Sequence, residues 1–309
     1  GGQDVTFQRA GLRDIAFVFQ LFALYPHLNV RRNIGYPLRC QGMARAEVRR
    51  RVEETAQILR ITHLLDQPVS GLSSGDRQRV ALGRAIVREP AAFLLDEPLG
   101  ALDAEFRELM CDELRALHDR LRATTVYVTH DQLEAMAMAD TIALMNDGRL
   151  EQLGPPQELY DRPASLFAAG FLGSPPMNLL PFRGRVQPGD RSVRLGLAEI
   201  EIPEAREGTA ETELVLGVRP EQVRLSDTAR LRAAVLEAEY LGTNQIVTLV
   251  TTDGAHLKAR LPSDLRVRTG DQTGLAFKPE KLSLFDQASG RVLRSALHDT
   301  HPDRRVAHG

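Results

Sequence analysis

The sequence predicts an α/β domain with a parallel sheet, followed by a smaller all-β domain. Over residues 13–172, short apolar runs alternate with helical runs, which is typical of parallel strands joined by crossover helices. The run Gly173-Ser174-Pro175-Pro176 has the composition of a linker, and helical periodicity disappears after it. A chain of 309 residues is long enough for two cores. We therefore expect an α/β domain at 1–172, an all-β domain at 173–288 and a flexible tail at 289–309.

The expected elements of the first domain follow from the spacing of its apolar residues. In chain order they are a strand at Ile15–Phe19, helices at Ala44–Leu59 and Ser73–Val87, a strand at Ala91–Leu95, a helix at Ala104–Leu121 and a strand at Thr125–Val128. Ser73 can cap the helix that it opens. A β-hairpin with the turn Asn146-Asp147-Gly148 closes the domain, between strands at Ile142–Met145 and Arg149–Leu153.

Short alternating runs predict the strands of the second domain, which would form a small β-barrel or sandwich. Examples are Leu214–Val218, Ile246–Val250 and Leu275–Phe277. A weak internal repeat is also present, because Arg219-Pro220-Glu221 and Lys278-Pro279-Glu280 each stand between two such runs. The alternative is that a strand, a Pro-Glu turn and a second strand are simply a common combination.

Composition excludes several classes of function. With 39 basic and 41 acidic residues, the chain has no overall field that would indicate nucleic acid as its main partner. No run reaches the roughly 18 consecutive apolar residues of a membrane span, and no signal peptide opens the chain, so a membrane role would come through a partner. The two cysteines, Cys40 and Cys111, are too few for a disulfide framework or a metal cluster, which fits a reducing cytosol.

Polar residues follow three of the predicted strands at their carboxyl ends. These residues are Gln20, Asp96, Glu97 and His130. Ligands of open α/β sheets bind at this edge, so one crevice can collect all four side chains. An apolar strand that ends in two carboxylates can hold a metal ion with the first and polarise a water with the second, which indicates nucleotide hydrolysis. The alternative is an acidic pair that only caps the following turn.

A second element lies about twenty residues upstream of the acidic pair. Ser73, Ser74 and Gly75 open a predicted helix, where free backbone N–H groups and the helix dipole favour a phosphate. An ordinary serine cap is the alternative for this element taken alone. The order of the two elements along the chain favours the nucleotide interpretation.

Four motifs in register resemble those of the ATP-binding cassette (ABC) ATPases. They are Leu72-Ser73-Ser74-Gly75-Asp76-Arg77-Gln78-Arg79-Val80-Ala81-Leu82, Phe93-Leu94-Leu95-Asp96-Glu97-Pro98, Ala101-Leu102-Asp103 and Val128-Thr129-His130-Asp131. A fifth, Phe17-Val18-Phe19-Gln20 followed by Ala23-Leu24-Tyr25-Pro26-His27, is similar to the importer branch of that family. The resemblance covers residues 14–172 and implies a P-loop NTPase fold. Residues 171–178 and the Arg219-Pro220-Glu221 region look like the OB-like accessory domain of importers for sugars or glycerol phosphate.

The resemblance implies a role for each matching residue. Asp96 matches the aspartate that supports the Mg²⁺ shell, and Glu97 matches the base that orients the attacking water. His130 matches the switch histidine that contacts the γ-phosphate of ATP. Gln20 matches the glutamine that approaches Mg²⁺ and this water, and Asp103 matches the aspartate that communicates between facing subunits.

Residues Ser73, Ser74, Gly75 and Asp76 match the family's signature motif, which closes over ATP bound to the opposite subunit. The sequence departs from the motif at Ser74, where glycine is expected, and at Asp76, where glutamine is expected. Ser74 adds a side chain where the backbone must approach phosphate, and Asp76 places a carboxylate nearby. Both departures can weaken the capture of ATP without excluding it.

No Gly-x-x-x-x-Gly-Lys-Ser/Thr phosphate loop occurs in the sequence, and the family would place this loop upstream of Gly1. We therefore expect a truncated copy of an ABC ATPase, which as it stands does not bind ATP measurably. We also expect its sheet to lack central strands, so that apolar edges favour aggregation.

The leading hypothesis is an ATP-binding subunit that hydrolyses ATP with Mg²⁺ and drives uptake of a solute of the sugar or glycerol-phosphate class. Its expected partners are a second ATPase subunit, transmembrane permease subunits and, indirectly, an extracytoplasmic solute-binding protein, at the cytoplasmic face of the plasma membrane. The alternative, which Ser74 and Asp76 favour, is a non-catalytic regulatory or structural subunit that pairs with an intact ATPase. A chromosome-maintenance or repair ATPase is disfavoured, because no long heptad run interrupts the domain.

Overall fold

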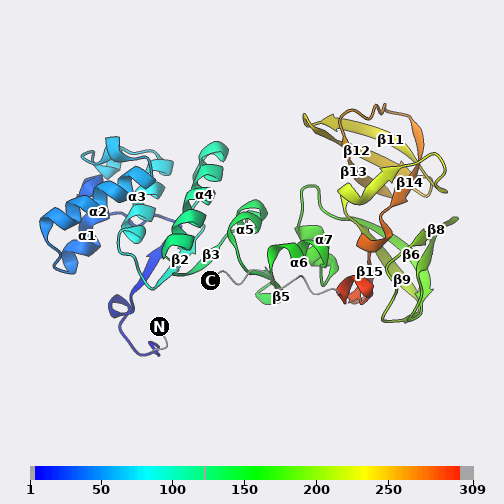
Figure 1. The fold of residues 1–309 in the computed structure, drawn as a ribbon, viewed down its shortest axis with the longest axis horizontal. Coiled ribbons are helices and arrows are strands. Elements are labelled where there is room, and N and C mark those ends of the chain that lie inside the picture. Colours follow the sequence, from blue (N-terminus) through cyan, green and yellow to red (C-terminus); the bar gives the residue numbers. More distant parts are fainter. Residues whose placement is uncertain (1–3, 122, 300–309) are drawn as a thin grey trace. The chain divides into compact units, whose positions relative to one another are not determined.

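Two compact units make up the chain, residues 1–138 and residues 139–309. The computed structural model describes residues 4–121 and 123–299. A parallel sheet lies in the first unit and antiparallel sheets lie in the second, in the order that the sequence predicts (Figure 1).

The division between the units comes earlier than the domain boundary expected after Leu172. The helix α7 (Leu166–Phe171) explains the difference. Its residue Ala169 is buried in a cluster with Val215 and Phe285 of the β domain, and Leu166 N donates to Gly290 O at 2.8 Å. Packing therefore places the predicted hairpin and the helices after it in the second unit.

The first unit alternates strands and helices. Its elements are β1 (Ile15–Val18), α1 (Val30–Cys40), α2 (Arg45–Ile58), α3 (Ser74–Ile86), β2 (Ala92–Asp96), α4 (Ala104–Leu121), β3 (Thr124–Val128) and α5 (Gln132–Met138), with 3₁₀ turns at Ala10–Leu12, Thr62–Leu64 and Val69–Gly71. The parallel sheet has the order β1-β2-β3, and it pairs Val18 with Leu95 and Asp96 with Val128. The carboxyl ends of the three strands therefore share one edge.

The helix α1 is absent from the predicted elements, because Gly35 and Pro37 have the lowest helix propensities. Tertiary packing explains the glycine. A Cβ at Gly35 would lie 3.0 Å from Val48 Cγ1 and 3.2 Å from Val52 Cγ2, so α1 and α2 approach closely at this point. Asn29 starts the helix, since its side chain accepts a hydrogen bond from the backbone of the first turn.

The parallel sheet buries one face and leaves the other open. Val18 and Leu95 belong to the core of the first unit. Phe17, Val126 and Val128 are turned to the opposite face, and they are 42%, 50% and 52% exposed. Apolar exposure in this sheet therefore lies on one face, whereas the sequence predicts it at the edges.

The second unit begins with the predicted hairpin and continues as an all-β domain. Its elements are β4 (Ile142–Asn146), β5 (Arg149–Gly154), α6 (Pro156–Asp161), α7, β6 (Asn178–Val186), β7 (Ser192–Leu195), β8 (Ala198–Glu201), β9 (Thr209–Val218), β10 (Val223–Leu225), β11 (Leu231–Tyr240), β12 (Asn244–Thr251), β13 (His256–Pro262), β14 (Gln272–Phe277), β15 (Ser283–Asp286) and β16 (Val292–Leu293), with 3₁₀ turns at Pro220–Gln222, Pro279–Lys281 and Ala296–His298. The main sheets have the orders β10-β14-β11-β12-β13 and β16-β15-β9-β6. In the hairpin, Asp147 and Gly148 have φ values of 46° and 76°, as a type I′ turn requires.

The weak sequence repeat corresponds to an exchange of strands between the two main sheets. Each copy is a strand, a 3₁₀ turn and a second strand, namely β9 to β10 and β14 to β15. The second strand of each copy pairs with the first strand of the other, since β10 pairs with β14 and β15 pairs with β9. The repeat is therefore a structural feature of the domain.

The predicted flexible tail is only partly consistent with the structure. Val292 and Leu293 form β16, pair with β15 and are buried, because each belongs to a hydrophobic cluster of the β domain. Residues 300–309 of the predicted tail lie outside the described residues.

Arg219 ties the helices α6 and α7 to the β domain. It is 3% exposed, and its guanidinium donates to the backbone oxygens of Tyr160 (2.7 Å from Nη2), Ala169 (3.3 Å) and Leu172. The guanidinium carbon also lies 4.0 Å from the centre of the Tyr160 ring, whose hydroxyl donates to Glu221. One buried cation thus satisfies carbonyl groups at the ends of both helices.

We predict that Arg219→Met lowers the free energy of unfolding by about 3 kcal/mol, because it leaves buried carbonyl groups without donors. Urea denaturation followed by circular dichroism measures this loss. The matched control is Arg224→Met at an exposed position of β10. Equal stabilities of the two variants would contradict the role given to Arg219.

Candidate functional site

Three of the predicted site residues meet at the carboxyl edge of the parallel sheet. Gln20 Nε2 donates to Glu97 Oε2 at 2.8 Å, and His130 Nδ1 lies 3.1 Å from Glu97 Oε1. Each residue follows a different strand, β1, β2 or β3. The two oxygens of one carboxylate are therefore held by side chains from the two neighbouring strands. We call Gln20, Glu97 and His130 the Glu97 group.

The backbone of Glu97, like its side chain, is held by hydrogen bonds. Its φ is 45°, in the left-handed region that costs a residue with a side chain about 1–3 kcal/mol. Glu97 N donates to Val128 O at 2.9 Å, while Glu97 O accepts from Gly100 N at 3.3 Å and from Gln78 Nε2 at 3.3 Å. These bonds compensate the strain and turn the carboxylate toward the other strand ends.

Asp96 precedes this residue and remains available for a ligand. Its side chain is partly buried, and it forms no hydrogen bond or ion pair with the residues at 4–121 and 123–299. The side-chain oxygen of Gln20 is also open, because the Gln20 contact to Glu97 uses the amide nitrogen. Such oxygen donors suit Mg²⁺, which takes few protein ligands and keeps its remaining positions for water and phosphate. The described residues hold no cluster of three or more His, Cys, Asp and Glu side chains that would bind a metal ion alone.

The loop that carries His130 is held by hydrogen bonds on both sides of it. Thr129 Oγ1 accepts from Asp131 N at 2.9 Å and donates to Glu134 Oε2 at 2.8 Å. Glu134 is 5% exposed and accepts a second bond from the Tyr127 hydroxyl at 2.8 Å. Burial, together with the nearby Glu134 carboxylate, raises the pKa of Tyr127, so its hydroxyl stays a donor.

Asp103 lies apart from the Glu97 group and caps a helix. Its Oδ1 accepts from Phe106 N at 2.9 Å at the start of α4. Arg107 connects this loop with the His130 loop, because its Nη2 donates to Leu102 O at 3.0 Å and its Nη1 lies 3.3 Å from Asp131 Oδ2. The Arg107 side chain therefore joins the Asp103 loop to the His130 loop by hydrogen bonds within one chain.

The residues predicted to form the signature motif open α3. Ser73 Oγ accepts from Asp76 N at 3.1 Å and donates to Asp76 Oδ2 at 2.7 Å, which is a reciprocal cap. Ser74 is exposed and Gly75 is partly buried. Among the residues that the structure describes, no hydrogen bond joins the side chains of this motif to the Glu97 group.

Comparison with known families matches three segments of the chain. A model described as ABC transporter matches residues 2–100, a MalK OB fold domain matches residues 173–223, and a TOBE domain matches residues 216–285.

Similar proteins extend the match over most of the chain. The ABC transporter ATP-binding protein y4oS of Sinorhizobium fredii is 46% identical over 290 residues, which are 94% of this chain and 78% of that protein. The trehalose/maltose import ATP-binding protein MalK of Thermococcus litoralis is 44% identical over 293 residues, 91% of this chain and 78% of that protein. The sn-glycerol-3-phosphate import ATP-binding protein UgpC of Cupriavidus pinatubonensis is 44% identical over 298 residues, 92% of this chain and 80% of that protein.

The chain belongs to the ABC transporter ATP-binding proteins. The predicted family and fold class are confirmed, with an ABC-type α/β domain and an OB-type β domain after it. In the part of the ABC protein that the structure describes, each helix is too short or too polar to cross a membrane.

Several residues that support the Glu97 group and the loops around it are absent from the predicted set, among them Gln78 and Glu134. A signal for Gln78 exists in the sequence. It precedes Leu82 and Ala85 by four and seven positions, so a polar residue occupies the apolar face of α3. The pairing of Glu134 with Tyr127 carries no comparable signal, since it depends on how α5 packs on β3.

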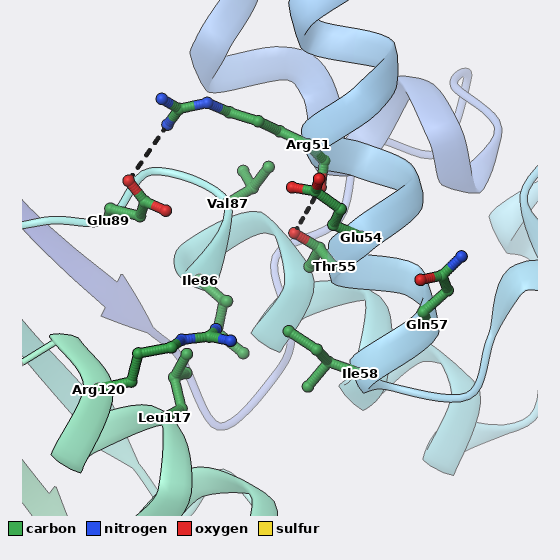
Figure 2. Close-up of a pocket in the computed structure, with 10 residues that line it drawn as sticks. All are labelled: Arg51, Glu54, Thr55, Gln57, Ile58, Ile86, Val87, Glu89, Leu117 and Arg120. Atoms are coloured by element: carbon green, nitrogen blue, oxygen red, sulfur yellow. Dashed lines mark hydrogen bonds and ion pairs between the residues drawn. The ribbon is translucent and has the colours of Figure 1, made fainter.

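A pocket of about 350 Å³ lies elsewhere in the ABC domain, between α2 and the carboxyl ends of α3 and α4 (Figure 2). Arg51 contacts Glu89 across it at 3.4 Å. The pocket is lined by Arg51, Glu54, Thr55, Gln57, Ile58, Ile86, Val87, Glu89, Leu117 and Arg120. It contains none of the predicted site residues, so it is separate from the candidate site.

We predict that Ser73→Ala lowers the free energy of unfolding by about 1 kcal/mol, because it removes the cap of α3. The neighbouring variant Ser74→Ala is the control, and it should change stability by less than about 0.5 kcal/mol. Urea denaturation measures both values. A control variant that loses as much stability as Ser73→Ala would show that the cap is unimportant.

Proposed function

We propose that this protein is the ATP-binding subunit of an ABC importer, in which its Glu97 group activates the water that attacks ATP. The observation that carries the proposal is the position of the Glu97 carboxylate between Gln20 and His130 at the carboxyl edge of the sheet. Relatives named as sugar and glycerol-phosphate import proteins support the same assignment.

In this proposal each member of the Glu97 group has its own task. Glu97 accepts a proton from the attacking water, which is typically worth about 10²–10⁴-fold in rate. Gln20 donates to Glu97 Oε2 and leaves its own side-chain oxygen for Mg²⁺ and the water bound beside it. The His130 side chain is 75% exposed, so its second ring nitrogen is open to a phosphate oxygen.

The oxygen donors fit Mg²⁺, which would be held by Asp96 and by the side-chain oxygen of Gln20 together with the nucleotide. Bound Mg²⁺ supplies charge neutralisation at the phosphates. What the chain itself provides is a free carboxylate at the end of β2, directly before the water-activating residue.

The phosphate-binding loop of the family, Gly-x-x-x-x-Gly-Lys-Ser/Thr, does not occur among these 309 residues. We propose that they do not hold ATP measurably by themselves, because the sequence contains no such loop. The signature residues Ser73 to Asp76 would face the nucleotide of a second ATPase subunit, with Asp103 beside them. Among the described residues, no hydrogen bond joins the side chains of this motif to the Glu97 group, which supports such a shared site.

The partners follow from this arrangement. We propose a second ATPase subunit, transmembrane permease subunits and, through them, an extracytoplasmic solute-binding protein that selects a sugar or a glycerol phosphate. The protein would work at the cytoplasmic face of the plasma membrane, held there by the permease. Relatives named as importers of trehalose, maltose and sn-glycerol-3-phosphate support this solute class.

The second candidate is a non-catalytic subunit that pairs with an intact ATPase. Ser74 and Asp76 favour it, since both stand where the family motif differs. Asp76 Oδ2 already accepts from the Ser73 hydroxyl, and Asp76 Oδ1 lies 3.5 Å from Arg79 Nη1. Both carboxylate oxygens of Asp76 therefore already have partners within this chain.

We predict that Glu97→Gln abolishes ATP turnover by the assembled importer in which these residues are joined to a phosphate loop. The loss should be about 10²–10⁴-fold, because the amide cannot accept the proton. Phosphate release from proteoliposomes measures turnover, and gel filtration with ATP measures dimers, which should persist.

The matched control is Glu108→Gln, an exposed residue of α4 with the same change of charge. Turnover of this variant should equal that of the unchanged protein. Turnover that survives Glu97→Gln would remove Glu97 from its role and favour the non-catalytic subunit.

A further inference from the structure

Gln78 is a buried amide whose two ends both bind the loop after β2. The residue is 2% exposed and lies in the first half of α3. Its Nε2 donates to Glu97 O at 3.3 Å, and its Oε1 accepts from Ala101 N at 3.2 Å. One side chain therefore binds both ends of the segment from Glu97 to Ala101.

The first turn of α3 packs against the same loop at a second point. A Cβ at Gly75 would lie 3.4 Å from Leu102 Cδ2 and 3.8 Å from Ala101 O. The signature residues and Gln78 thus contact one continuous loop from two successive turns of one helix. A displacement of this helix end is transmitted to the loop directly.

Glu97 depends on this contact because of its backbone conformation. A left-handed residue with a side chain persists only where its surroundings fix it. Its N–H is fixed by Val128 of β3, and Gln78 fixes its carbonyl group from the other side. Without Gln78, the local bond from Gly100 N is the one that this carbonyl group keeps among the described residues.

We propose that Gln78 is a positioning residue for Glu97, which couples the start of α3 to the direction of the Glu97 carboxylate. The functional part of this inference rests on the proposed ATPase role, whereas the structural part does not. Through Gln78, contact at the signature residues of a subunit aligns the water-activating carboxylate of that same subunit. Volume alone does not account for Gln78, because an apolar side chain of similar size would fill the space and leave Ala101 N–H without an acceptor.

The structural test is amide hydrogen exchange in the 309-residue chain, with residue-level mass spectrometry over residues 97–101. Gln78→Met keeps the volume and removes both hydrogen bonds, and Gln78→Asn is a second variant whose amide is too short to reach. In each, exchange at Ala101 should become at least about tenfold faster. Exchange that is unchanged in both variants would overturn the proposal.

Two controls separate positioning from a general loss of stability. Val80→Ala removes buried volume from the same helix, and Gln57→Met makes the same substitution at an exposed site of α2. Neither should accelerate exchange at Ala101 selectively. Equal acceleration in Val80→Ala, at a matched melting temperature, would also overturn the proposal.

The functional test uses the assembled importer described above. Gln78→Met should lower kcat about 10²-fold, the effect of a misplaced catalytic group, with little change in the KM for ATP. An unchanged kcat, with Ala101 exchange accelerated, would overturn the positioning role. Turnover that survives Glu97→Gln would instead overturn the proposed function, and the exchange result would still stand.

Discussion

The candidate site depends on the left-handed backbone of Glu97. A residue with a side chain adopts this conformation at a cost of about 1–3 kcal/mol, so the surrounding structure has to supply compensating bonds. Here Val128 O accepts from its N–H, Gln78 donates to its carbonyl group, and Gln20 and His130 hold its carboxylate. If Glu97 adopted an extended conformation instead, the chain after β2 would lose these partners together.

Each of these bonds is a consequence of the parallel sheet and the helix that packs beside it. The register that places Asp96 opposite Val128 brings the ends of β2 and β3 together, and the adjacent β1 brings Gln20 to the same edge. The helix α3 adds Gln78 from the side. The topology of the sheet thus brings together residues that are far apart in the sequence. The β domain contributes to none of these bonds, which all lie within the first unit.

Sequence reasoning can predict most of the fold of the first unit, because its strands and helices follow apolar periodicity. It also finds Gln20, Glu97 and His130, since each follows a predicted strand. The helix α1 lacks such a signal because packing against Val48 and Val52, and not local propensity, stabilises it. The backbone strain at Glu97 has no sequence pattern, since glutamate rarely adopts positive φ. The regular structure within residues 289–299 likewise depends on tertiary contacts, because β16 forms by pairing with β15.

The fold constrains Glu97 so that its carboxylate points to the other strand ends. A high-resolution crystal structure of this chain tests the claim most directly, because it determines the backbone dihedral of Glu97 and the positions of its neighbours. We expect a positive φ at Glu97, a carboxylate between Gln20 and His130, and a carbonyl group bonded to Gln78. An extended Glu97 whose carboxylate leaves Gln20 and His130 would contradict the claim.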